Sequence, residues 1–152
     1  LFYQFKFLIA TRRFFDAYEK SLFIDKLKSK LHDAEVCVLD SRNYRFGKRL
    51  RSDVSDYSND LRGIPIIIDG RTVFLGSIDL PREGSCKENG ILIFDEVSSS
   101  DKTTQASIDS LLDTKKILSY ELPKGWSIIV ILDSLDLEMK KILNRVLALG
   151  IE

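Results

Sequence analysis

Residues 90–96 read Gly90-Ile91-Leu92-Ile93-Phe94-Asp95-Glu96, four consecutive apolar residues that run directly into two carboxylates. A short unbroken apolar run is typical of a strand buried on both faces, as in a parallel sheet. Charged side chains rarely lie at the end of such a strand without a partner or a function. In an open α/β sheet, ligands bind at the carboxyl ends of the strands. The stretch therefore predicts a central strand with Asp95 and Glu96 at a ligand-binding edge, or else a strand followed by an acidic turn.

The pair Asp95-Glu96 suits phosphate chemistry. An Asp at the end of such a strand helps to hold magnesium in phosphoryl transfer. A carboxylate beside it can position or activate a water molecule. The two residues together are therefore candidates for a magnesium-dependent reaction at the edge of the sheet.

Apolar patterns on both sides of this strand predict an alternation of strands and helices. Such alternation implies parallel βαβ units with right-handed crossovers. The chain is therefore predicted to form an α/β domain with a parallel sheet of about five strands and helices on both faces. The predicted strands span residues 5–10, 35–39, 91–94 and 127–132, and the predicted helices span 20–31, 102–113 and 137–148.

Two short hairpins interrupt this alternation. Residues 66–68 and 72–75 read as strands joined by Asp69-Gly70, a strong signal for a hairpin turn. Residues 115–122 predict a second small hairpin, centred on Lys115-Lys116. Both are expected to be β-hairpin insertions in the main sheet arrangement.

Composition limits the possible functions. The chain has 152 residues, enough for one compact domain. Its 23 acidic and 23 basic residues balance, which predicts no bulk attraction to nucleic acid or to an anionic membrane. No apolar run approaches the roughly 20 residues that span a bilayer.

The cysteine and histidine content disfavours a Cys/His metal site and a histidine-dependent catalytic triad. Cys37 and Cys86 are far apart and form neither a metal-binding cluster nor a disulfide framework. Cys37 lies in an apolar pattern and is predicted to be a small buried hydrophobic residue. His32 is the only histidine. A reducing, cytoplasmic setting fits this cysteine usage.

Three segments in order carry a family resemblance. The segment Asp60-Leu61-Arg62-Gly63-Ile64-Pro65 precedes the strand at 91–94, a helix with Gln105 follows it, and Tyr120-Glu121-Leu122-Pro123-Lys124-Gly125-Trp126 comes next. Together they resemble the AAA+ ATPases, specifically the MoxR-like and dynein-related branch. The resemblance spans roughly residues 35–150 and implies one three-layer P-loop NTPase-like domain over residues 1–152. The family's helical lid has no room after Glu152, as in a truncated chain or a reduced variant.

The phosphate-binding loop departs from this resemblance. A P-loop has the form Gly-x-x-x-x-Gly-Lys-Ser/Thr, whose backbone N–H groups cradle phosphates. Lys20-Ser21 stands at the predicted junction of strand and helix, but Phe14 and Glu19 occupy the two glycine positions. Carboxylates at Asp16 and Glu19 would repel a triphosphate, by about 4 kcal/mol for unit charges about 4 Å apart at an effective dielectric of about 20. The cradle is therefore predicted to be degraded, and Lys20 and Ser21 can equally be a solvated helical turn.

The resemblance also implies roles for the remaining site residues. Asp95, with Ser21, would coordinate Mg²⁺, and Glu96 would polarise the attacking water. The family's sensor Asn falls at Asp133, which lacks the amide donor and adds negative charge. Asp133 can instead cap the next helix. Arg145 matches the arginine that reaches a neighbour's γ-phosphate across a ring interface, with a solvent-facing helix residue as the alternative.

The basic stretch at residues 42–51 offers a different interpretation. It contains five Lys and Arg residues, with Tyr44 and Phe46 between them. Charge and aromatic stacking of this kind can contact single-stranded nucleic acid. The alternative is a solvated loop after the second strand, which the zero net charge favours.

Three functions remain open at this point. The first is an AAA+ ATPase-like module that binds ATP and Mg²⁺, assembles in a ring and remodels a client protein. The second is a pseudo-ATPase scaffold that has lost turnover, and the third is a small nucleic-acid-binding domain. The first two require the tip of the strand near Asp95 and the turn near Lys20 to share one rim of a single parallel sheet.

Overall fold

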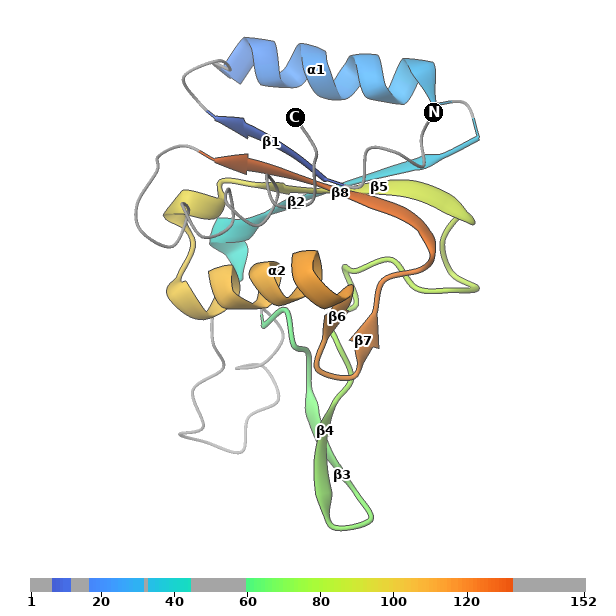
Figure 1. Ribbon diagram of the computed structural model, residues 1–152, viewed down its shortest axis with the longest axis vertical. Helices are drawn as coiled ribbons and strands as arrows, with labels where there is room; N and C mark the ends of the chain where they lie inside the picture. Colours follow the sequence, from blue (N-terminus) through green and yellow to red (C-terminus); the bar gives the residue numbers. More distant parts are fainter. Residues whose placement is uncertain (1–6, 12–16, 32, 45–59, 133–152) are drawn as a thin grey trace.

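The computed structural model describes residues 7–11, 17–31, 33–44 and 60–132, which form a three-layer α/β arrangement (Figure 1). Within these residues, four parallel strands pair in the order β1-β8-β5-β2. The arrangement confirms the predicted P-loop NTPase-like parallel sheet with hairpin insertions. The main elements are β1 (Phe7–Thr11), α1 (Ala17–Lys30), β2 (Glu35–Asp40), β5 (Asn89–Asp95), α2 (Lys102–Thr114) and β8 (Gly125–Leu132).

The strand order explains why the two helices lie on opposite faces. From β1 the chain passes through α1 to β2 at the far edge, whereas from β5 it passes through α2 back towards β1. Parallel crossovers are right-handed in nearly all proteins, so crossovers that run in opposite directions place their helices on opposite faces. Figure 1 shows α1 above the sheet and α2 below it. The carboxyl ends of all four strands consequently lie along one rim.

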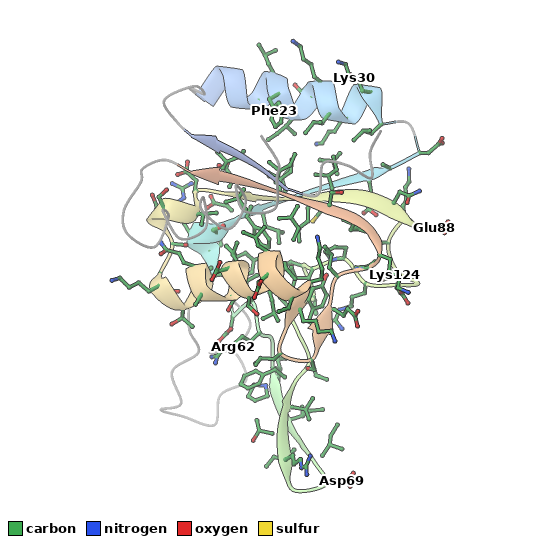
Figure 2. The ribbon with its side chains drawn as sticks, in the orientation of Figure 1. Phe23, Lys30, Arg62, Asp69, Glu88 and Lys124 are labelled. Carbon is green, nitrogen blue, oxygen red and sulfur yellow. The ribbon has the colours of Figure 1, made fainter. Side chains whose placement is uncertain are left out.

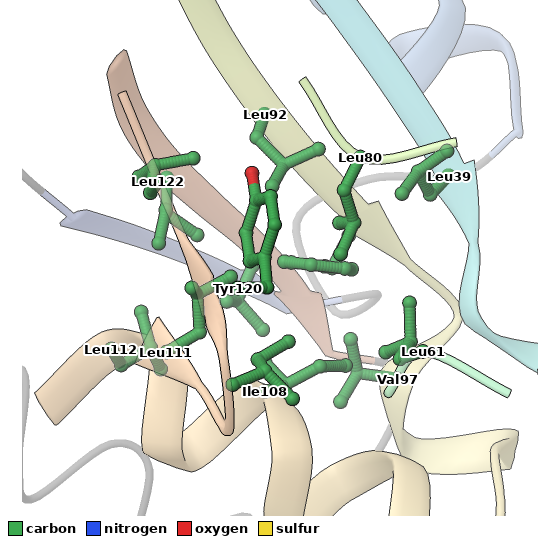
Figure 3. Close-up of a cluster of buried hydrophobic side chains, with 14 of the residues drawn as sticks. Leu39, Leu61, Leu80, Leu92, Val97, Ile108, Leu111, Leu112, Tyr120 and Leu122 are labelled. Carbon is green, nitrogen blue, oxygen red and sulfur yellow. The ribbon is translucent and has the colours of Figure 1, made fainter. Parts of the chain in front are cut away.

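β5 is buried on both faces, as its apolar run predicts. Leu92 and Phe94 face the larger core on the α2 side, whereas Ile91 and Ile93 face a smaller core on the α1 side. Full burial of a side chain of this size contributes about 1.5–3 kcal/mol. Figure 3 shows the larger core between β5 and α2. The helices contribute Ile108, Leu111 and Leu112 from α2 and Phe23, Ile24, Leu27 and Leu31 from α1.

The first hairpin projects away from the sheet (Figures 1 and 2). Its strands, β3 (Pro65–Ile68) and β4 (Arg71–Phe74), are antiparallel. The turn residues Asp69 and Gly70 have φ values of 52° and 76°. Positive φ at both central positions defines the turn that matches the twist of a two-residue hairpin, as the Asp-Gly pair predicts.

The base of this hairpin is fixed by an ion pair and a close backbone approach. Arg62 donates from Nε and Nη2 to the carboxylate of Asp60 at 3.1 and 2.8 Å, and its guanidinium lies 4.9 Å from the centre of the Phe74 ring. A Cβ atom added to Gly63 would lie 2.3 Å from the backbone of Gly76. The hairpin is therefore joined to the domain by packed backbone rather than by a loose linker.

The second hairpin differs from its prediction. Its strands are β6 (Lys116–Ile117) and β7 (Tyr120–Glu121), so Leu118-Ser119 forms the turn. Lys115 is not part of the turn, because it takes a left-handed conformation that ends α2 and donates its N–H to Leu111 at 2.9 Å. The Ser119 hydroxyl donates to the carbonyl of Phe74, which links the two hairpins.

Two buried tyrosines tie the segment before β5 to the domain. The Tyr44 hydroxyl donates to Asp79 at 2.6 Å, and the Tyr120 hydroxyl donates to the carbonyl of Pro81 at 2.7 Å. Burial is the main cause that raises the pKa of both tyrosines above the ordinary value, followed for Tyr44 by its hydrogen bond to Asp79. Cys37 packs against the larger core but is only partly buried, whereas the sequence predicted a buried residue; burial is the main cause that raises its thiol pKa.

Alkaline pH is expected to destabilise the protein through these two tyrosines. Above about pH 10 the unfolded chain loses the phenolic protons that the native state keeps. The native state then binds more protons, so the free energy of unfolding falls as pH rises, by up to about 1.4 kcal/mol per pH unit for each tyrosine. Urea unfolding between pH 9 and 11 should show a smaller slope for Tyr120→Phe than for wild type. Equal slopes in wild type, Tyr120→Phe and Tyr44→Phe would contradict this assignment.

In the part of the chain that the structure describes, neither helix has the length and apolar character needed to cross a membrane. The predicted helix at 137–148 lies outside the described residues.

Candidate functional site

The carboxyl ends of the parallel strands bring the first candidate residues to one rim. Asp40 ends β2 and is paired in register with Asp95, which ends β5. On the other side, Thr11 at the end of β1 is paired with Leu132 at the end of β8. β8 lies between β1 and β5, so the carboxyl end of β1 lies two strands away from Asp95 on the same rim. Figure 1 shows that α1 also begins on this side of the sheet.

Glu96 adopts an unusual backbone conformation directly after β5. Its φ and ψ are 56° and 36°, the left-handed region. For a residue other than glycine this conformation costs about 1–2 kcal/mol. Asp95 supports the turn, because its Oδ1 accepts the Glu96 N–H at 2.8 Å. Residues that are held in an unfavourable backbone conformation occur most often at functional sites.

Gln105 fixes the segment that follows Glu96. This segment contains the 3-10 helix η3 (Val97–Ser99). The Gln105 side chain is 5% exposed and donates from Nε2 to the carbonyls of Val97 and Ser100, both at 3.1 Å. α2 is itself anchored by Asp101, whose carboxylate caps the helix by accepting the Thr104 N–H at 2.7 Å. The position of Glu96 is therefore set by α2 as well as by β5.

Arg42 forms a second charged group at the same rim. It lies in the 3-10 helix η1 (Ser41–Asn43), which packs against η3. Its Nε and Nη2 donate to the two carboxylate oxygens of Asp40 at 3.0 and 2.7 Å. This hydrogen bond and the charge of Asp40 raise the pKa of Arg42, and the charges of Glu96 and Asp95 raise it further. The rim thus holds the carboxylates of Asp40, Asp95 and Glu96 and the guanidinium of Arg42.

The predicted P-loop residues lie inside a helix. α1 begins at Ala17, so Lys20 and Ser21 are its fourth and fifth residues rather than its start. Ser21 is exposed. The first N–H groups of a helix lack intrahelical acceptors and attract anions, and here they belong to residues 17–20. Residues 12–16, Asp133 and Arg145 lie outside the described residues.

The structure changes the interpretation of the basic stretch. Tyr44, predicted as a possible stacking residue, is 5% exposed and its hydroxyl is bonded to Asp79. Its ring therefore cannot stack on a base, and Arg42 is engaged by Asp40. The remainder of the stretch, residues 45–51, lies outside the described residues.

Sequence reasoning did not identify Asp40 and Arg42 as parts of the site. One signal was present, because Asp40-Ser41-Arg42 and Asp60-Leu61-Arg62 share the spacing Asp-x-Arg. In both segments the Asp also accepts the N–H two residues ahead, at 3.0 Å for Arg42 and 2.9 Å for Arg62. A carboxylate that accepts both this N–H and a forked guanidinium forms a compact local ion pair.

Comparison with known proteins supports the fold. The sequence matches no protein-family model and no curated protein. Among solved structures it is similar to Hsp104, in a closed-state cryo-EM reconstruction with ATPγS and FITC casein. The identity is 13% and the TM-score 0.51, over 93% of this chain and 25% of that chain. At this identity the likeness shows the fold alone, an α/β arrangement similar to that of the matched part of Hsp104.

Proposed function

We propose that this chain is an AAA+ ATPase module of the MoxR-like branch, which binds ATP with Mg²⁺ and acts as a ring subunit on a client protein. The observation that carries the proposal is the position of Asp95 and Glu96. Both are half-buried at the carboxyl end of a fully buried central strand, on the rim where α1 begins. In open α/β sheets this rim binds ligands.

Asp95 is the residue that would hold Mg²⁺. Within the described residues, no group of three His, Cys, Asp or Glu side chains is placed to hold a metal alone. Mg²⁺ commonly takes one or two carboxylates and fills its other positions with phosphate and water oxygens, which fits this arrangement. When bound, the ion would neutralise charge on the phosphate oxygens.

Glu96 is the residue that would accept hydrogen bonds from a water molecule beside the phosphate. Its left-handed backbone and the Gln105 contacts to the segment that follows hold the Glu96 backbone in one place relative to β5. Positioning of this kind supports general-base catalysis because the base must lie within hydrogen-bond reach. Asp133 and Arg145 remain proposed as the sensor and the arginine supplied to a neighbouring subunit.

The first hairpin supports a role in assembly or client contact. Ile67 and Ile68 are 79% and 49% exposed on β3, far from the sheet (Figure 1). Exposed apolar groups of this kind mark surfaces that contact other proteins. The two inserted hairpins are also the features that the MoxR-like branch leads one to expect. The Hsp104 structure contains casein, which is consistent with a protein client for the present fold.

A pseudo-ATPase scaffold is the second candidate, and the position of α1 favours it. A P-loop requires a glycine-rich turn before its Lys, but here Glu19 is already helical and residues 12–19 contain no glycine. Such a chain would keep the fold and its partner surfaces without turnover.

Replacement of Glu96 by Gln separates the two candidates. If the chain is an ATPase, Glu96→Gln should lower the hydrolysis rate about 100-fold while leaving Mg–ATP affinity within about threefold. Phosphate release and binding of a fluorescent ATP analogue would measure the two effects. Glu88→Gln is the matched control, because Glu88 is exposed just before β5 begins, at the opposite rim. ATP binding without hydrolysis in wild type would favour the scaffold, and no binding at millimolar ATP would exclude the ATPase.

A further inference from the structure

A pocket of about 500 Å³ lies at the opposite rim of the sheet from Asp95. It is bounded by the end of α1, the loop into β2, the first residues of β5 and β8, and the segment that leaves β7. The volume falls in the range of about 300–1,000 Å³ that is usual for small-molecule sites. No residue of the candidate nucleotide site lines it.

The wall of the pocket is apolar and held in place. Leu31, Leu122, Pro123 and Trp126 line it. The Trp126 indole donates from Nε1 to the carbonyl of Lys87 at 3.0 Å and packs directly on the backbone of Gly90, where an added Cβ would lie 2.5 Å from the ring. The indole is therefore fixed by contacts on its face and its edge.

The charged residues around the pocket are mostly basic. Three lysines line it: Lys30 at the end of α1, Lys115 after α2 and Lys124 before β8. Two carboxylates, Asp33 and Glu121, also line it. Lys30 and Lys124 are exposed, and neither forms an ion pair within the described ranges. Figure 2 shows both on the side of the molecule where β5 begins. Asp33 and Glu121 are exposed as well, so the positive excess comes from the half-buried Lys115. An apolar wall with exposed lysines beside it is complementary to an anion with an apolar body.

We propose that this pocket binds an organic anion with a flat apolar body, such as an aromatic carboxylate or sulfonate. The apolar body packs along Leu31, Leu122 and Pro123, and the anionic group lies between Lys30 and Lys124 at the mouth. The site is separate from the nucleotide rim, so this proposal does not depend on ATP binding.

Trp126 provides a direct measurement, since it is the only tryptophan of the chain. The probe is anilinonaphthalene sulfonate, an aromatic anion that accepts energy from excited tryptophan. Titration of the intact chain should quench Trp126 emission with a saturable, single-site curve. Lys30→Glu and Lys124→Glu should each weaken binding about fivefold, because each reverses a charge at the mouth. Ala34→Phe, which fills part of the wall, should weaken binding whatever the charge of the probe.

Two controls distinguish recognition of the anion from general apolar binding. Lys102→Glu reverses an exposed lysine at the start of α2, outside the pocket, and should leave the affinity unchanged. Phenylnaphthylamine, which lacks the sulfonate, should bind the wild type and both mouth variants equally. The proposal is overturned if the anionic probe does not quench Trp126, or if the mouth variants and Lys102→Glu have the same affinity. Circular dichroism of each variant verifies that the fold is retained.

Discussion

Gly63→Ala is expected to lower the free energy of unfolding by about 3 kcal/mol, the combined cost of backbone strain and overpacking. Gly63 has a φ of 84°, which an alanine adopts at a cost of about 1–2 kcal/mol. In addition, the new Cβ would lie 2.3 Å from backbone atoms of Gly76, which cannot rotate away as a side chain can. The base of the first hairpin must therefore shift, and its hydrogen bonds from Leu75 to Ile64 and from Gly76 to Arg62 must lengthen.

Gly70→Ala separates the two contributions. Gly70 has a similar φ of 76°, but an added Cβ there would meet nothing within 4 Å. This variant should lose only the strain of about 1–2 kcal/mol. Urea unfolding of both variants gives the difference, which is the cost of the clash alone. If Gly63→Ala is no less stable than Gly70→Ala, the hairpin base is not packed as described.

Phe94→Ala is expected to destabilise the protein by about 3–5 kcal/mol. Phe94 is fully buried at the centre of the sheet and packs in the larger core with Leu39 and Val130 on the neighbouring strands. Its removal leaves a cavity that the sheet cannot close, because β5 is paired on both sides with β2 and β8. A loss of this size is a large part of the usual stability of a domain, about 5–15 kcal/mol.

Ile67→Ala is the control for this variant. Ile67 is also a large apolar strand residue, but it is 79% exposed on β3. Its truncation should change the stability by no more than about 0.5 kcal/mol. Thermal unfolding followed by circular dichroism compares the two variants. A loss below about 1 kcal/mol for Phe94→Ala would mean that β5 is not the central strand.

Local patterns predicted the elements whose structure is fixed by nearby residues. The apolar run before Asp95 identified β5, and the Asp69-Gly70 pair identified the turn of the first hairpin. Helical spacing in residues 20–31 identified the apolar face of α1. Each of these signals acts within a few residues, through side-chain periodicity or turn geometry.

Long-range relations could not be predicted in the same way. The pairing of β1 with β8 joins residues more than a hundred positions apart, for example Phe7 and Ile128, and no local pattern specifies it. The place of Arg42 near Asp95 and Glu96 follows from the pairing of β2 with β5, which no local pattern specifies either, so the sequence showed only another basic residue. The end of α2 was predicted to within one residue, but the turn of the second hairpin was misplaced at Lys115-Lys116, because a lysine carries little intrinsic preference for the left-handed conformation with which Lys115 ends the helix.

The backbone at Glu96 has a consequence for how substitutions at this position should be interpreted. A glycine would take up the same φ and ψ with less steric cost, so folding alone favours glycine there. The chain instead carries a carboxylate and sacrifices some thermodynamic stability to keep it. Under the proposed ATPase role, Glu96→Gly would therefore gain stability and lose hydrolysis together.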